Sequence, residues 1–191
     1  MKRTLLILIC LGFTVLANAT PPQSRLAIHA GRQLPVLDSL VGLAGWAVVP
    51  NLLDKAGLKS LVVVGLSQRY QGGSVEFLVG GLFTQQEARP LVNVRSWYNW
   101  RWLHNYGELQ WFPKQQSGLT TIWSDIPVRL NGNVLFKTGI EANYYFNPGK
   151  DSYELGPNLV VPLSGGVIFT VAHLKNNTGE WCTRIYTTIN F

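Results

Sequence analysis

The chain has 191 residues, a length that fits a single domain. It carries 16 Lys and Arg against 10 Asp and Glu, and the basic residues are scattered along the chain. Because a nucleic-acid partner would favour a clustered basic patch, we expect none. No stretch of about 18 or more apolar residues follows residue 19, so we also expect no membrane-spanning helix.

Residues 1–19 have the three parts of a secretory signal peptide. Lys2 and Arg3 precede an apolar run from Leu5 to Leu16, and Ala17-Asn18-Ala19 has the small residues of a cleavage site. We therefore expect export and a mature chain that begins at residue 20. Without the two basic residues of the leader, 14 basic residues remain against 10 acidic ones, a net charge of +4.

Residues 20–58 are expected to form an N-terminal periplasmic arm. Its first part, residues 20–35, contains three prolines and is predicted to be a loop. Apolar residues between positions 40 and 48 fit helical spacing, whereas residues 39–49 fit a Gly-containing strand equally well. Pro50 would end either element.

The chain from residue 59 onward alternates in the manner of successive strands with short connections. Residues 91–102 are the clearest case, because Val92 and Val94 share one face and Asn93 and Arg95 share the other. Asn131-Gly132 predicts a tight hairpin turn, since both residues tolerate positive φ. We expect strands at residues 59–70, 74–84, 91–102, 107–114, 119–130, 133–146, 152–163, 165–175 and 180–191.

Nine strands conflict with the even number expected when both termini of a bacterial barrel are periplasmic. Either residues 39–49 supply a tenth strand, or one of the nine is not a strand. The segment 152–163 is the weakest, because it contains Pro157 and Pro162 and a closed barrel has no free edge. Both eight and ten strands stay open, with eight strands and a short N-terminal helix preferred.

The last predicted strand has one apolar face and one polar face. The apolar face consists of aromatic, aliphatic and threonine side chains and ends on an aromatic residue: Trp181, Thr183, Ile185, Thr187, Ile189 and Phe191. The polar face carries Glu180, Cys182, Arg184, Tyr186, Thr188 and Asn190.

This terminal pattern, with the leader and the alternating strands, resembles Gram-negative outer-membrane β-barrel proteins. The resemblance implies localisation in the outer membrane and contact with its lipid. It also implies handling by periplasmic chaperones and insertion by the barrel-assembly machinery, for which Ile189 and Phe191 would form the assembly signal. The implied fold is an all-β, antiparallel, up-and-down transmembrane barrel of eight or ten strands over residues 59–191.

Length and aromatic content support a membrane barrel. Tilted strands of about 9 to 12 residues can cross an apolar band of about 25 Å. The seven Trp and seven Tyr residues suit aromatic girdles at the two membrane interfaces. The alternative is a soluble, secreted β-barrel that binds a small apolar ligand and buries the same aromatic residues.

The charged residues of the predicted polar faces are candidates for the barrel interior. They comprise five acidic and five basic side chains, so they could pair in a narrow interior, where an unpaired charge costs several kcal/mol. The candidate interior or pore-lining residues are Glu76, Arg95, Arg101, Glu108, Asp125, Arg129, Lys137, Glu141, Glu154 and Arg184.

No catalytic or cofactor-binding motif stands out. The three histidines, His29, His104 and His173, are isolated, no Gly-x-Ser-x-Gly elbow occurs, and no His/Cys cluster has zinc spacing. We therefore expect no cofactor, no metal and no catalytic residue. The preferred function is a structural envelope protein or a narrow channel, and a lipid-modifying enzyme of the outer membrane is the main alternative within the membrane.

Overall fold

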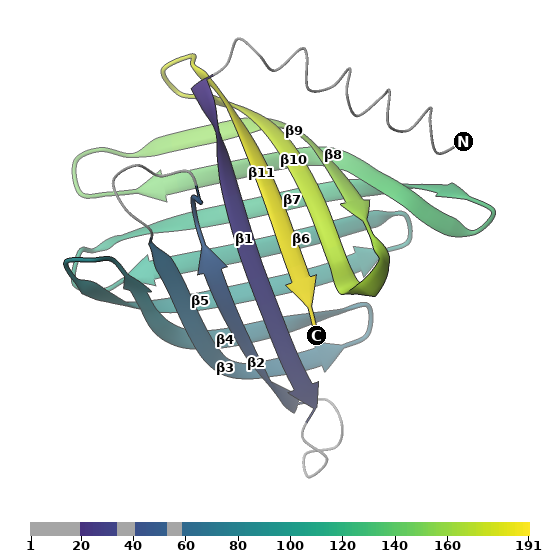
Figure 1. Cartoon of the computed structure of the whole chain (residues 1–191), viewed down its shortest axis with the longest axis horizontal. Helices are drawn as coiled ribbons and strands as arrows, with labels where there is room; N and C mark the ends of the chain where they lie inside the picture. The colour runs from purple at the N-terminus through teal and green to yellow at the C-terminus, as the bar shows by residue number, and fades with distance from the viewer. Residues whose placement is uncertain (1–19, 34–40, 53–58) are drawn as a thin grey trace.

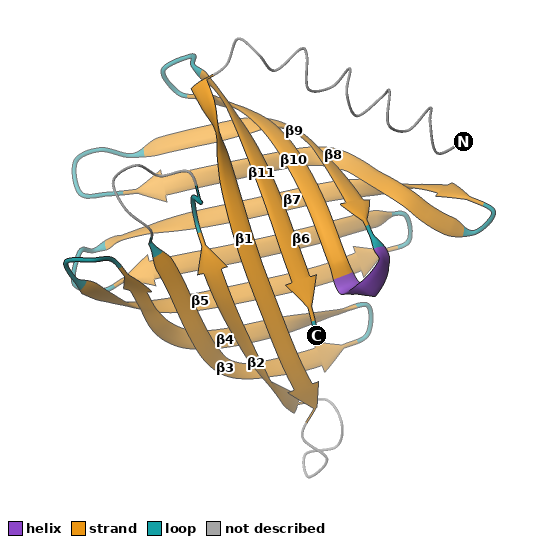
Figure 2. Cartoon of the chain, in the orientation of Figure 1, coloured by secondary structure: helices purple, strands orange, loops and turns teal. Residues whose placement is uncertain are grey.

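The computed structural model describes residues 20–33, 41–52 and 59–191, which form a closed barrel of eleven strands (Figures 1 and 2). One turn of 3-10 helix, Ser164–Gly166, precedes β10. The strands are β1 (Thr20–Gln33), β2 (Val41–Val49), β3 (Ser60–Tyr70), β4 (Gly73–Phe83), β5 (Ala88–Trp100), β6 (Leu103–Phe112), β7 (Ser117–Leu130), β8 (Asn133–Phe146), β9 (Ser152–Pro162), β10 (Val167–Asn176) and β11 (Trp181–Asn190).

The barrel closes through a parallel pair. Each strand pairs antiparallel with the next one in sequence, whereas β1 pairs with β11 in parallel, with Ile28 opposite Ile189. An up-and-down barrel with an odd strand number must contain one such pair, because its first and last strands point the same way. In Figure 1, β1 and β11 run side by side across the front of the barrel.

The predicted strand number of eight or ten was therefore wrong, and the difference lies at the N-terminus. Residues 20–33, expected to be a loop, form β1, and the ambiguous segment contributes β2. Pro21 and Pro22 fall at the irregular start of β1, where the pairing with β11 shifts register between Thr20 and Gln23, and Pro35 lies outside the described residues. Residues 152–162 do form a strand, with Pro162 as its last residue.

Some predictions fall outside the described residues. These are the leader at residues 1–19 and the parts of the N-terminal arm at residues 34–40 and 53–58. The helix considered between residues 40 and 48 is not formed, because residues 41–49 are β2.

The two ends of the barrel differ in their connections. At the end that carries Phe191, here called the C-terminal end, the turns after β3, β5 and β7 have two residues each and the connection after β9 has four. Asn131 and Gly132 form one of these turns with φ of 50° and 80°, which confirms the predicted hairpin. At the opposite end, here called the loop end, the connections after β4, β6, β8 and β10 have four or five residues.

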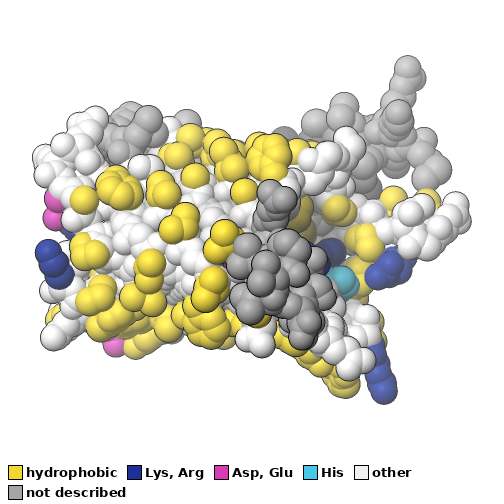
Figure 3. All heavy atoms as spheres, turned by 90° about the horizontal axis from the view of Figure 1, so that it is seen from below, with side chains coloured by type: hydrophobic (Ala, Val, Ile, Leu, Met, Phe, Trp, Pro, Cys, Tyr) yellow, Lys and Arg dark blue, Asp and Glu magenta, His cyan; other side chains and the backbone are white. Residues whose placement is uncertain are grey.

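The outer surface of the wall is apolar and nearly free of charge. Large apolar side chains are exposed there on most strands, for example Val64 at 60%, Phe77 at 57% and Ile140 at 57%. Among strand residues whose side chains are described, Lys175 near the end of β10 is the one outward residue with a formal charge. In Figure 3, hydrophobic side chains cover the wall, and the charged ones in view lie toward the two ends.

Outward aromatic side chains gather near both ends of the strands. Phe136 and Tyr144 lie eight residues apart on β8, which is about 27 Å along the strand and about 21 Å along the axis for a tilt of about 40°. The set at the C-terminal end is Tyr70, Tyr98, Trp100 and Phe136, and the set at the loop end is Phe83, Trp111, Tyr144, Phe146, Tyr153 and Trp181.

The interior is packed in the half of the barrel near the loop end. Apolar side chains from β2 to β5, including Val48, Leu61 and Leu91, form a buried cluster against which Phe112 of β6 packs. On the other wall, Ala172 and Leu174 of β10 are fully buried. This packing leaves the half near the C-terminal end as the place for a cavity.

Candidate functional site

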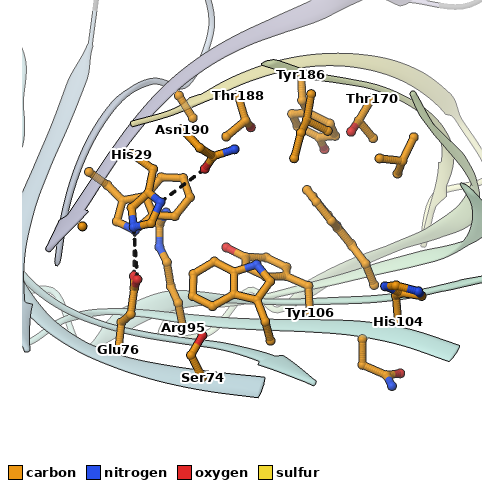
Figure 4. A pocket seen from close by; sticks show the side chains of 18 of the residues that line it. His29, Ser74, Glu76, Arg95, His104, Tyr106, Thr170, Tyr186, Thr188 and Asn190 are labelled. Carbon is orange, nitrogen blue, oxygen red and sulfur yellow. Dashed lines mark hydrogen bonds and ion pairs between the residues drawn. The ribbon is translucent and has the colours of Figure 1, made fainter. Parts of the chain in front are cut away.

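A chamber of about 490 Å³ occupies the interior toward the C-terminal end (Figure 4). Its lining includes Asn99, Lys137 and Phe191, which lie close to that end, and reaches down to Arg25 and Arg95 in the middle of the barrel. The volume falls within the range of small-molecule binding sites.

Six rings form a belt around the inside of the chamber. We define the aromatic belt as His29, Trp46, Trp97, Tyr106, Trp123 and Tyr186. Successive ring centroids are 4.2, 5.9, 5.3, 4.8 and 5.7 Å apart. The six rings come from β1, β2, β5, β6, β7 and β11. Arg25, also on β1, closes the circle because its guanidinium lies 6.0 Å from the Tyr186 ring. Rings in these offset and tilted arrangements attract one another and stiffen the wall.

Below the belt, Glu108 accepts contacts from four neighbouring side chains. Its Oε1 lies 2.8 Å from Arg95 Nη2 and also accepts hydrogen bonds from Asn93 and Gln110 at 3.0 and 2.8 Å. Tyr106 donates to its Oε2 at 2.8 Å. Arg95 is 1% exposed and Glu108 is 3% exposed, so this ion pair is held out of water.

Two arginines share that carboxylate from opposite sides of the barrel. Arg25 reaches from β1 to within 3.7 Å of Glu108 Oε2 on β6, and the Arg95 guanidinium lies 4.1 Å over the ring of Trp46. Because the charges, rings and amides interlock across the interior, they form the floor of the chamber. Removing Glu108 would leave the buried Arg95 without its ion-pair partner.

A second network ties the wall formed by β8, β9 and β11. Arg184 Nη2 lies 2.5 Å from Glu154 Oε2 and donates to the Tyr145 hydroxyl at 2.6 Å. Glu141 lies 4.0 Å from Arg184 Nη1 and accepts a hydrogen bond from the Tyr186 hydroxyl at 2.7 Å. Through Tyr186 this network is joined to the aromatic belt.

His29 connects the first strand to β4 and β11 inside the chamber (Figure 4). Its Nδ1 and Nε2 each lie 3.2 Å from an oxygen, of Asn190 and Glu76 respectively. The Asn190 amide nitrogen donates to Gly166, so its oxygen is the atom that faces the ring. Glu76 also accepts from Trp46 Nε1 at 2.7 Å.

The rim of the chamber carries a cluster of polar side chains from β6, β7 and β8. Lys137 Nζ lies 3.4 Å from His104 Nδ1. Arg129 is close enough to both residues to act on them electrostatically. Asp125, 6% exposed, lines the chamber beside them, and its Oδ1 has no hydrogen-bond partner among the described residues. We call these four residues the rim cluster.

Most of the candidate interior residues lie inside the barrel. Eight of them are on inward positions of their strands, and they divide between the floor, the Arg184 network, the rim cluster and the His29 contacts. These eight are Glu76, Arg95, Glu108, Asp125, Lys137, Glu141, Glu154 and Arg184.

The other two candidates lie at the C-terminal end. Arg101 is exposed in the turn after β5, with φ of 51° and its guanidinium 5.5 Å from the Trp100 ring, because the strand ends one residue before it. Arg129 is near the end of β7, exposed, and donates to the Gly132 carbonyl at 3.4 Å. For the predicted assembly signal, Ile189 pairs with Ile28, and Phe191 is 81% exposed, with its N–H on the His29 carbonyl.

The sequence reasoning missed the residues that β1 contributes. Arg25 and His29 alternate with Leu26 and Ile28, which is a strand pattern, but the prolines nearby suggested a loop.

The aromatic belt was missed for another reason. Outward and inward aromatic residues look alike in a sequence, and one strand can carry both kinds. On β5, Trp97 lines the chamber, whereas Trp100, three residues later, is half exposed on the outer surface. Only the face that each residue occupies separates the belt from the girdles.

Comparisons with known proteins give no assignment: no family model matches the chain, and no similar curated protein and no similar solved structure was found. The part of the chain that the structure describes contains no helix long and apolar enough to cross a membrane. Within the same residues, no three His, Cys, Asp or Glu side chains are grouped so that they could hold a metal ion.

Proposed function

We propose that this chain is an outer-membrane β-barrel with a closed interior, an envelope protein and not an open channel. The observation that carries the proposal is the outer wall, which is apolar between two sets of aromatic residues while the charges lie inside. A wall of that kind matches a lipid-facing band of about 25 Å flanked by aromatic girdles.

The outer wall also weighs against a soluble secreted barrel. A soluble protein rarely exposes a contiguous apolar surface of more than a few hundred Å², because water penalises it. Here exposed apolar side chains occur on nearly every strand, from Leu43 on β2 to Tyr153 on β9. The charged side chains of the strands point to the interior, where they share the space with the apolar cluster of β2 to β5, whereas the outer face is apolar.

The interior favours a closed barrel over a channel. Near the loop end it is filled by the apolar cluster of β2 to β5, and in the middle by Arg25, Arg95 and Glu108. A conducting pore needs a continuous aqueous path, whereas these side chains pack and pair across the barrel. Conduction would require the buried ion pairs to separate, at a cost of several kcal/mol.

The short turns suggest which end faces the periplasm. Bacterial barrels of this class have short periplasmic turns and longer outer loops. The two-residue turns after β3, β5 and β7 lie at the C-terminal end, so this end would be periplasmic. The start of β1 would then lie at the outer face, unlike in the even-stranded bacterial barrels. The chamber then opens toward the periplasm.

Cell fractionation with gel electrophoresis of unboiled and boiled samples tests this proposal. We expect recovery in the outer-membrane fraction and a heat-dependent shift in mobility, because a closed membrane barrel resists unfolding by detergent. In planar bilayers we expect no conductance steps. A soluble protein without a mobility shift would refute the membrane location, and stable conductance steps would refute the closed interior.

A further inference from the structure

The chamber has the features of a ligand site and not of a packing defect. Its volume of about 490 Å³ is far above that of a single water molecule, and its wall is an ordered set of stacked rings.

The charges of the lining favour an anion. Four cationic side chains, Arg25, Arg69, Arg95 and Lys137, line the chamber against two carboxylates, Glu76 and Asp125. Glu108 beneath the lining neutralises one further charge through its contacts with Arg25 and Arg95. With Glu141, Glu154 and Arg184 of the adjoining network also counted, the interior holds five cations and five carboxylates, and Arg129 at the rim adds one positive charge.

The excess positive charge lies at the rim and not at the floor. The two floor cations, Arg25 and Arg95, face two carboxylates, because Glu108 contacts both and Glu141 acts on Arg25. Glu76 is held by His29 and Trp46. Neither Lys137 nor Arg69 forms an ion pair with a described residue, and Arg129 adds a third cation beside Lys137. The rim cluster thus holds two cations against the single carboxylate of Asp125.

From this arrangement we propose that the chamber binds a flat, amphipathic organic acid: an aromatic or fused-ring body with one carboxylate group. The body lies against the aromatic belt, where ring stacking and burial of apolar surface stabilise it. The carboxylate lies at the rim, where Lys137 lines the chamber and supplies a charge-assisted hydrogen bond, and Arg129 adds positive charge beside it. This inference goes beyond the proposed envelope role and does not depend on the membrane in which the barrel resides.

Isothermal titration of the detergent-solubilised full-length protein with three matched probes tests the proposal. The probes are 2-naphthoate, 2-naphthalenemethanol and 2-naphthylmethylammonium, which share one body and differ in head-group charge. We expect naphthoate to bind about tenfold more tightly than the alcohol, with the ammonium probe weakest. Equal binding of all three, or no binding of any, would overturn the proposal.

Three variants separate the head-group site from the body site. Lys137→Gln should weaken naphthoate binding about tenfold and leave the alcohol unchanged, because it removes only a charge. Trp123→Leu should weaken both probes alike. Arg101→Gln is the matched control, since it removes an exposed cation at the same end that does not line the chamber.

Two results would point to other ligand chemistry. Tightest binding of the ammonium probe would make Asp125, the carboxylate of the rim cluster, the head-group site and overturn the assignment to an acid. If R101Q and K137Q weaken naphthoate binding equally, the preference for an anion comes from the overall charge of this end of the barrel. That result would overturn the assignment of the rim as the head-group site. The heat-dependent mobility shift, measured on each variant, shows that the barrel has formed, so a loss of binding is not a loss of folding.

Discussion

A charge placed on the outer wall gives the most direct energetic test of the membrane location. Val79 lies on β4 and points outward with 60% of its side chain exposed. It is four residues from Phe83 of the loop-end girdle, which is about 14 Å along the strand and about 10 Å along the axis at a tilt of about 40°. Val79 is therefore close to the middle of the proposed apolar band.

Val79→Arg should destabilise the barrel in lipid by about 2 to 4 kcal/mol, the cost of an arginine near the bilayer midplane. On a water-exposed wall the same substitution would change stability by less than about 0.5 kcal/mol. The assay is reversible denaturant unfolding of the protein in lipid vesicles, with wild type and variant compared at equal lipid composition.

Ser60→Arg is the matched control. Ser60 is the first residue of β3 and pairs with Phe83, so it lies at the level of the girdle and not at the midplane. There an arginine should cost only about 0 to 1 kcal/mol. If V79R and S60R have equal effects, or if V79R has none, the outer wall does not face a bilayer and the reasoning fails.

Two further predictions concern groups inside the barrel and in a loop. Glu108→Ala should destabilise the barrel by about 3 to 5 kcal/mol in the same unfolding assay, because Arg95, which is 1% exposed, loses its ion pair. The control is Glu87→Ala, which removes an exposed ion pair with Arg89 and should cost about 0 to 1 kcal/mol. Equal losses of stability in the two variants would contradict the role of the buried pair. In the loop after β8, hydrogen bonds from the Tyr144 hydroxyl and from a backbone N–H lower the pKa of Asp151. These bonds therefore stabilise the loop fully above the usual pKa of an aspartate, and the stabilisation is lost as the pH falls through the lowered pKa. An NMR titration of the Asp151 carboxyl should give a midpoint below that of a free aspartate, and a normal or raised midpoint would contradict the hydrogen bonds.

The alternation of the sequence contained most of the information on strands and on which side chains face inward. Period-two patterns need only local chemistry, so the sequence alone assigns Arg95 to the inward face of its strand and Asn131-Gly132 to a tight turn. The same patterns predicted a barrel. They did not predict β1, because Pro21 and Pro22 indicated a loop. The irregular start of β1 tolerates these two prolines.

Strand number, closure and the chamber were decided by the tertiary structure. Whether β1 joins the barrel depends on its pairing with β11, about 160 residues away, and a parallel closing pair leaves no local signal. The aromatic belt likewise joins rings that are distant in sequence, such as Trp46 and Trp97, or Trp123 and Tyr186. A sequence shows that a residue is aromatic or charged, but which residues meet across the interior depends on the curvature and register of the closed sheet.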